Sequence, residues 1–341
     1  MQREQWIDVF RGIGIVLVVW GHVYGGYSFD LIFLFHMPLF FFISGYLFQP
    51  VGDIAAFARR KAVQLLLPYA VFLLAINIPL AIDLFANKPH DQAAVLRFAG
   101  DLLLGGSRLS SWVAAFWFAT SFYAVLLIEA RLLGRYRRRT LLWLHAGMLL
   151  LSYANNWFFP DLQVPWALNV ALAAAPFFYA GYLLRAMPRQ RRLYRGAALA
   201  AGLACMAVVA NRYFGWHLGL GYDMKVAHYG VPVLTFAAAL ACCVTLVRIA
   251  RHISARHAAV ARCLAGLGQA ALAIMFMHMV FTMGVAALAG ERYQFARFAL
   301  GLAGSYLVYR ESRKHVWSRA LLLGSAGDFE RLRRRWREAR G

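Results

Sequence analysis

The chain has 341 residues, of which 62% are hydrophobic and only 15% are charged, and its mean hydropathy is +0.56. This composition excludes an ordinary soluble domain and predicts an all-α, polytopic transmembrane helical bundle. The formal net charge of +21 does not indicate nucleic-acid binding, because Lys and Arg gather in alternate loops between apolar runs.

Hydrophobic run length, with breaks at Pro, Gly and charge clusters, predicts about ten membrane-spanning helices. Their expected ranges are 7–24, 32–48, 63–83, 112–130, 140–158, 167–184, 196–212, 227–247, 264–288 and 294–310. The connection 84–111 contains RFAGDLLLGG, which is too short to span and is expected to form a re-entrant or interfacial helix. We expect a membrane domain over residues 1–310 and a basic cytoplasmic tail over residues 311–341.

The distribution of basic residues predicts the orientation of these helices. If the N-terminus is cytoplasmic, the inner segments hold 29 of the 36 Lys and Arg residues, and the outer side holds the other 7. Cytoplasmic loops of membrane proteins carry such an excess, so both termini are expected in the cytoplasm. The tail stretch RLRRRWREAR is expected to be solvated or to bind anionic headgroups of membrane lipid.

Nothing in the sequence indicates a metal site. The four cysteines lie in or beside apolar runs without zinc-ligand spacing or suitably placed histidines: Cys205, Cys242, Cys243 and Cys263. We expect them to be packing residues.

The first apolar run, RGIGIVLVVWGH, carries a cation at one end and an imidazole at the other. Arg11 and His22 are eleven positions apart, which places them on one helix face and about 16 Å apart along the axis. Asp8 lies three residues before Arg11, where it can pair with it. The simpler interpretations are that Arg11 is a snorkelling anchor and that His22 is a structural residue held by a hydrogen bond. However, ionisable residues inside membranes often mark transport pathways or reaction centres, and this favours a functional role. The run lacks a small-residue cleavage site, so we interpret it as a retained helix.

The second apolar run contains FLFHMPLFFFISGYLF. His36 enters this run just after the short outer turn YGGYSFD, so it is expected at a depth similar to that of His22. A structural hydrogen bond and a role in acceptor binding are both open for His36.

Other polar residues lie within or beside the expected spans: Asn77, Glu129, Asn169 and His278. Hydrogen bonding between helices is the commoner role of such residues, and lining of a passage is the alternative. Asn169, near the outer side, is a candidate for acceptor contacts, whereas Glu129 is expected to be structural. Asp223 and His228 flank an outer helix start and are expected to act as a cap or a solvated pair.

The blocks IDVFRGIGIVLVVWGH and FHMPLFFFISGYLF resemble the opening of the acyltransferase family 3 membrane proteins, particularly the branch similar to fucose O-acetylases. The signature of that family is an arginine, ten residues and a histidine in the first membrane helix, and Arg11 and His22 satisfy it. Weaker similar blocks are LLLPYAVF, FWFATSFYAVLL, VPWALNVALAAAPFFYAGYLLR and LGQAALAIMFMH, so the likeness extends over roughly residues 5–310.

The resemblance implies an enzyme of a bacterial inner membrane that moves an acyl group, usually acetyl from acetyl-CoA, to a hydroxyl of a carbohydrate or lipid-linked glycan. Arg11 and His22 fall on the essential pair of the family, with His22 as the catalytic residue and Arg11 suited to the phosphates of the donor. His36 and His278 match histidines of similar blocks and, with Asn169, are expected to bind substrate. His22 acts either as a general base or as a transient acyl acceptor.

Two other classes of protein also fit the pattern. A carrier or flippase would use Arg11 and the histidines to bind an anionic or lipid-linked substrate or to relay protons. A non-catalytic partner in a polysaccharide assembly would bind no acetyl-CoA.

Overall fold

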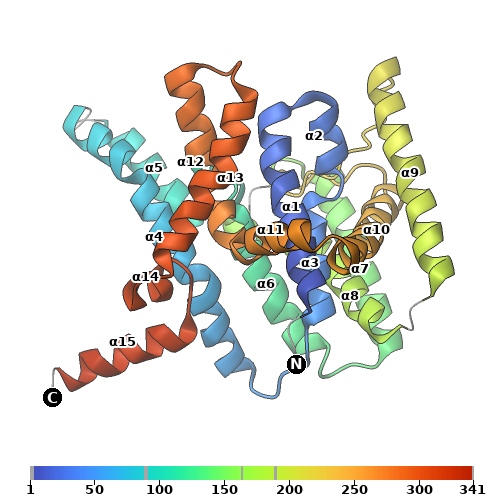
Figure 1. Cartoon of the computed structure of the whole chain (residues 1–341), viewed down its shortest axis with the longest axis horizontal. Helices are drawn as coiled ribbons and strands as arrows, with labels where there is room; N and C mark the ends of the chain where they lie inside the picture. Colours follow the sequence, from blue (N-terminus) through green and yellow to red (C-terminus); the bar gives the residue numbers. More distant parts are fainter. Residues whose placement is uncertain (1–3, 88–90, 163, 188–189, 340–341) are drawn as a thin grey trace. The chain divides into compact units, whose positions relative to one another are not determined.

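A computed structural model describes residues 4–87, 91–162, 164–187 and 190–339 (Figure 1). Residues 88–90 of the expected outer connection and residues 340–341 of the expected tail lie outside these ranges. The described residues form helices, and their one β-type pairing is an isolated bridge between Asp223 and His228. The all-α prediction is therefore confirmed.

Eight helical segments of the described chain are long and apolar enough to cross a membrane. They are Gln5–Tyr24, Gly26–Leu47, Ile54–Ala86, Ser111–Leu132, Pro165–Ala186, Arg191–Phe214, Leu234–Arg256 and Ala271–Ala289. The two remaining expected spans are present as α7 (Arg138–Phe158) and α13 (Gln294–Ser312). These two helices are less apolar because they carry residues such as Asn155 and Arg297.

Several helix boundaries differ from the expected ones; the helix expected at 63–83, for example, is α4 (Ile54–Asn87) and begins nine residues earlier. The span expected at 32–48 is divided into α2 (Gly26–Phe33) and α3 (His36–Leu47). The span expected at 227–247 begins later, as α10 (Leu234–Arg256), because Val233 has a φ of 62° and cannot continue a helix. The span expected at 264–288 is divided at Ala270.

The chain forms two compact units. Unit 1 comprises Met1–Pro50, Arg131–Leu162 and Asn169–Ala271, and unit 2 comprises Val51–Ala130, Gln163–Leu168 and Leu272–Gly341. The helices of unit 1 are α1 (Gln5–Tyr24), α2, α3, α7, α8 (Leu168–Ala186), α9 (Arg191–Phe214), α10 and α11 (Ala258–Gln269).

In unit 1, α11 runs across α1 (Figure 1), and the two helices make the most extensive packing of the fold. Glycines make this approach possible, because a Cβ on Gly12 would overlap the carbonyl of Leu264 and a Cβ on Gly268 would overlap the carbonyl of Asp8. Small residues allow this close backbone contact between membrane helices. The crossing therefore fixes the part of α1 that includes Arg11.

A second reciprocal glycine pair joins α3 to α8. A Cβ on Gly45 would overlap the carbonyl of Phe178, and a Cβ on Gly181 would overlap the carbonyl of Phe42. Each glycine thus receives the backbone of the other helix, and this contact holds the helix that begins with His36.

An arginine holds the ends of four helices of unit 1 together. The guanidinium of Arg251, on α10, lies 4.5 Å from the ring centroid of Trp6 on α1. It also donates hydrogen bonds to the hydroxyls of Tyr194 on α9 (2.9 Å) and Tyr46 on α3 (3.1 Å). Cation–π and hydrogen-bond contacts of this kind stabilise a partly desolvated arginine.

Unit 2 contains α4 (Ile54–Asn87), α5 (Gln92–Leu104), α6 (Trp117–Leu132), α12 (Ala271–Ala289), α13, α14 (Val316–Leu321) and α15 (Ala326–Glu338). Its apolar core brings together Tyr69 and Phe72 of α4 with Phe116 and with Phe276 of α12. The helix α5 lies within the segment expected to be re-entrant or interfacial. Trp166 fixes the end of α5, because its Nε1 donates a hydrogen bond to the carbonyl of Leu103 (3.0 Å).

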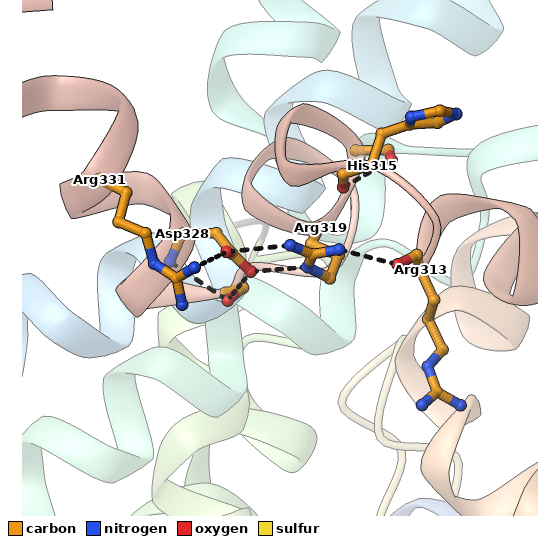
Figure 2. A network of polar contacts seen from close by, with 7 residues as sticks. Arg313, His315, Arg319, Asp328 and Arg331 are labelled. Atoms are coloured by element: carbon orange, nitrogen blue, oxygen red, sulfur yellow. Dashed lines mark hydrogen bonds and ion pairs between the residues drawn. The ribbon is translucent and has the colours of Figure 1, made fainter. Parts of the chain in front are cut away.

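The expected tail folds against the rest of unit 2. Leu322 packs against the apolar core, and Gly324 approaches the backbone of Gln64 on α4. Figure 2 shows the polar network that joins the two tail helices: Arg319 donates to both carboxylate oxygens of Asp328, at 2.8 and 3.2 Å. Arg331, on α15, lies 3.7 Å from the same carboxylate.

Candidate active site

The first helix carries the two residues expected to be essential. The helix α1 is continuous from Gln5 to Tyr24, so the face shared by Arg11 and His22 is not interrupted by a kink. Both side chains are partly exposed, whereas Phe10, Ile15 and Val18 beside them are buried. Arg11 and His22 are thus partly accessible on a helix of which more than half is buried.

The imidazoles of His22 and His36 lie close together. Their ring centroids are 6.5 Å apart, and the ring planes are nearly perpendicular, at 83°. Phe33 packs against both rings, with centroid distances of 5.4 Å to His22 and 4.3 Å to His36. The chain reverses at Gly25, which has a φ of 56°, so that α2 and α3 run back along α1 and bring His36 to the level of His22. The convergence expected from the sequence is therefore present.

Backbone hydrogen bonds determine the tautomer of both rings. Nδ1 of His22 lies 2.8 Å from the carbonyl oxygen of Val18, and Nδ1 of His36 lies 3.0 Å from that of Ile32. A carbonyl oxygen only accepts, so Nδ1 must carry the proton in each ring. Nε2 of a neutral ring then holds the lone pair, which is the state required of a base or a nucleophile.

The loop between α9 and α10 carries two charged residues, Asp223 and Lys225. Burial raises the pKa of Asp223 above its ordinary value, and the neighbouring Lys225 and His22 oppose this shift. Burial also lowers the pKa of Lys225, and Asp223 opposes that shift. The loop thus holds an acid and a base that are both partly removed from water.

The sequence did not predict that buried side chains anchor this loop. Asp223 was expected to be a cap or a solvated partner of His228, and Lys225 was not singled out. The available signal was the composition of GYDMKVAHYG, in which two charged residues are interleaved with aromatic and aliphatic ones. Tyr222 and Tyr229 are fully buried in the structure, which shows that this loop is packed rather than solvated.

The remaining candidates have well-defined local roles. Asn169, at the start of α8, donates a hydrogen bond from Nδ2 to Oδ1 of Asn155 on α7, at 2.8 Å. His278 belongs to unit 2, where it is completely buried in α12. Its Nδ1 lies 2.9 Å from the carbonyl oxygen of Ile274 and 3.0 Å from that of Met275. Of the candidates in unit 1, His36 lies beside His22. Asn169 instead contacts Asn155 on α7.

Unit 2 also contains a cavity of about 810 Å³, a size that accommodates a small molecule. Its wall is mainly apolar, from α4, α5 and α12, and includes the ion pair of Asp101 with Arg108 (3.6 Å). Asn77 also lines it and donates a hydrogen bond to the carbonyl of Leu73 at 2.8 Å. Among the described residues, no group of three or more His, Cys, Asp or Glu side chains has an arrangement that would hold a metal ion.

These features define a polytopic helical membrane protein with a histidine pair in its first spans. The model of a protein family, described as an acyltransferase domain, matches residues 4–310, and the chain belongs to this family, acyltransferase family 3. The chain is therefore a membrane acyltransferase. Comparisons with curated proteins and with solved structures found no match.

Proposed function

We propose that the protein transfers an acetyl group from acetyl-CoA to a hydroxyl of a carbohydrate, such as a surface polysaccharide, lipopolysaccharide or glycolipid precursor, at the inner membrane of a bacterium. The observation that carries this proposal is the pair of His22 and His36, placed 6.5 Å apart on the helices that bear the family motif. The resemblance to fucose O-acetylases supports the choice of acetyl and carbohydrate.

The reaction uses Nε2 of His22 as the general base. It removes the proton of the acceptor hydroxyl while the oxygen attacks the thioester carbonyl carbon. The carbon–sulfur bond breaks, and the imidazolium returns the proton to the CoA thiolate. The hydrogen bond from Nδ1 to Val18 holds the ring in the tautomer that this step requires.

Arg11 is the proposed ligand of the donor. Acetyl-CoA is cytosolic and polyanionic, and a guanidinium binds phosphate oxygens through two parallel hydrogen bonds. With the N-terminus in the cytoplasm, Arg11 lies about 16 Å nearer the inner side than His22. The donor thus enters from the cytoplasm, and the acceptor meets the histidine pair from the outer half of the membrane.

The test is release of CoA thiol by the purified protein supplied with acetyl-CoA and candidate glycans. We expect His22→Ala to lower the rate by at least about 100-fold, the usual contribution of a general base. His145→Gln is the control, because His145 also lies in a helix of unit 1 and its Nδ1 also lies close to the carbonyl oxygen four residues earlier, at 2.7 Å. That variant should keep most of the activity.

Full activity of His22→Ala in a monodisperse sample would contradict the role of the histidine. Absence of thiol release by the unmodified protein with every acceptor, together with substrate movement across vesicles, would favour a carrier. Mass spectrometry of surface glycans from cells with and without the protein identifies the acceptor.

A further inference from the structure

We infer that the cavity of unit 2 binds one zwitterionic phospholipid, with a hydrocarbon chain inside the cavity, the phosphate at Arg108 and the ammonium group at Asp101. All residues that line the cavity belong to unit 2. The inference goes beyond the proposed function, because it assigns a lipid site that does not depend on the reaction proposed for His22.

The wall of the cavity suits a hydrocarbon chain. The cavity has a volume of about 810 Å³, within the range of small-molecule sites. Side chains of α4, α5 and α12 form most of the wall, including Phe72, Phe98, Met277 and Val280. These apolar groups gain from the burial of a chain and offer no partner to a polar group, so the part of the ligand that they contact should be apolar.

The cavity is also open to the bilayer. Both α4 and α12 are apolar enough to cross a membrane. On α4, the lining residues Ala75 and Leu80 are exposed. In a membrane, the surroundings of such exposed apolar residues are lipid chains rather than water. A lipid chain can therefore enter sideways without crossing water.

One polar side chain interrupts the apolar wall on α4. Asn77 donates one hydrogen bond from Nδ2 to the carbonyl of Leu73, at 2.8 Å. An amide nitrogen of this kind carries two protons, so the second can bond a ligand. In a glycerophospholipid an ester carbonyl directly follows the hydrocarbon chain, and this acceptor matches the donor on Asn77.

A pair of opposite charges lies at the exposed edge of the cavity. Nη1 of Arg108 lies 3.6 Å from Oδ1 of Asp101, and the two side chains are 42% and 46% exposed. A pair this exposed contributes little to stability, so a ligand can separate the two residues at small cost. Arg108 then contacts a phosphate, which guanidinium groups bind through paired hydrogen bonds, and Asp101 contacts an ammonium group.

The two charges favour a zwitterionic head over an anionic one. A phosphate alone would neutralise Arg108 but would bring its negative charge next to Asp101. A head with both charges gives each side chain an opposite partner, so neither is left beside a like charge. Ser110, which also lines the cavity, supplies a hydroxyl donor for a further phosphate oxygen. Phosphatidylethanolamine, whose ammonium group donates hydrogen bonds, matches this set of partners.

Backbone packing fixes the segment that carries Arg108. A Cβ on Gly106, which has a φ of 62°, would overlap the backbone nitrogen of Ala167. Leu109 is buried in the apolar core of unit 2. The guanidinium thus extends from a backbone that is held on both sides, and a site built on ordered backbone loses less entropy when it binds a ligand.

Native mass spectrometry tests the site on the purified whole chain, titrated in detergent with phosphatidylethanolamine or with phosphatidylglycerol of the same chains. We expect one molecule of phosphatidylethanolamine to bind, with a Kd about 10-fold lower than that of phosphatidylglycerol. Asp101→Asn should remove this preference. Arg108→Gln should weaken binding of both lipids about 10-fold, because a charge-assisted bond to phosphate is lost. Arg97→Gln, at an exposed position of α5 outside the wall, is the control and should leave both affinities unchanged.

Filling the cavity tests where the chain lies. Ala75→Trp adds a large side chain at an exposed position of the wall, so it should remove binding of both lipids without disturbing the core. Leu74→Trp, at the neighbouring exposed position of α4, lies outside the wall and should bind lipid as the unmodified chain does. Thermal unfolding in detergent checks that both variants are folded.

The absence of a retained lipid, equal affinity for the two lipids, or unchanged binding by Ala75→Trp would each overturn the site. Equal weakening by both tryptophan variants would indicate general contact with bilayer lipid and would overturn it as well. None of these measurements depends on thiol release, so this inference and the proposed function can fail separately.

Discussion

At the scale of single residues, the backbone hydrogen bond of His22, the proposed general base, is shared by other histidines. His22, His36, His145 and His278 each place Nδ1 near the carbonyl of the residue four positions earlier. This bond sets the tautomer but does not select one ring for chemistry. His145, for example, stacks on Tyr179 with centroids 4.2 Å apart, which is a packing role. What distinguishes His22 and His36 from the other two is that their imidazole rings lie next to each other.

The proposed role of Arg11 predicts a particular kinetic effect. Arg11→Lys keeps the charge but loses the planar fork that binds a phosphate through two hydrogen bonds. We expect the KM for acetyl-CoA to rise about 10-fold, equivalent to about 1.4 kcal/mol, with kcat changed less than twofold. Initial-rate kinetics at varied donor concentration check this, and an unchanged KM with a lower kcat would show that Arg11 does not bind the donor.

Sequence reasoning found some residues of the site and could not find others. His22 and His36 belong to successive apolar runs joined by a short turn, so their approach follows from chain reversal alone. The loop between α9 and α10 is held by Tyr222, whose ring lies 5.4 Å from that of Phe177 on α8, and a local pattern contains no information on such a distant contact. The prediction that Asn169 binds the acceptor was based only on its expected depth in the membrane. Depth does not reveal a hydrogen-bond partner such as Asn155.

At the scale of elements, the glycine contacts predict which substitutions disturb helix packing. Gly45→Ala should destabilise unit 1 by about 1–3 kcal/mol, because the added methyl group meets the backbone of Phe178, which cannot rotate away. Gly147→Ala, on α7, has no atom within 4 Å of the new Cβ and should be neutral or stabilising by up to about 1 kcal/mol. Thermal unfolding in detergent compares the two, and equal unfolding temperatures would contradict a tight crossing of α3 and α8.

The junction of α14 and α15 predicts a pH dependence. The side chains of Arg319 and Ser325 lower the pKa of Asp328 from 3.8 to about 2. A carboxylate with a lowered pKa stabilises the fold above its ordinary pKa, and this contribution is lost as the pH falls through the folded value. Between about pH 4 and pH 2 the two tail helices should therefore loosen.

Hydrogen exchange of residues 316–338 measures this loosening, after correction for intrinsic exchange rates. At neutral pH, Asp328→Asn should reproduce the faster exchange. Glu330→Gln is the control, because the pair of Glu330 with Arg333 is exposed and 3.7 Å long, a kind of contact that contributes little. Equal protection in both variants would show that the Asp328 network does not join the helices.

At the scale of the whole molecule, the two-unit organisation was not predictable from the sequence. The chain passes from unit 1 to unit 2 between Ala271 and Leu272, inside the continuous apolar stretch LGQAALAIMF. The hydropathy does not change at this point and the apolar run is not interrupted, because the residues before and after it are equally apolar. The all-α class was predictable, since only helices or closed barrels satisfy their backbone groups within a bilayer, and the runs have the length of helices.

The number of crossings follows from charge and hydropathy taken together. The basic segments 131–139 and 185–195 are both expected in the cytoplasm. Because α8 is apolar enough to span and ends at the second of these segments, its start is expected outside. The helix α7 must then cross the membrane as well, although His145, Ser152 and Asn155 lower its hydropathy. The same reasoning applies to α13, which links the outer end of α12 to the basic residues after Arg310.

Cysteine labelling tests this arrangement of ten crossings. In a background with the four native cysteines replaced, a single cysteine at Asp161 or Glu291 should react with a membrane-impermeant maleimide in intact spheroplasts. A cysteine at Arg137 should react only after the membrane is permeabilised. If Asp161→Cys is protected until permeabilisation, α7 does not cross. The end of α8 would then lie outside together with the five basic residues of 185–195, and the arrangement of ten crossings would be wrong.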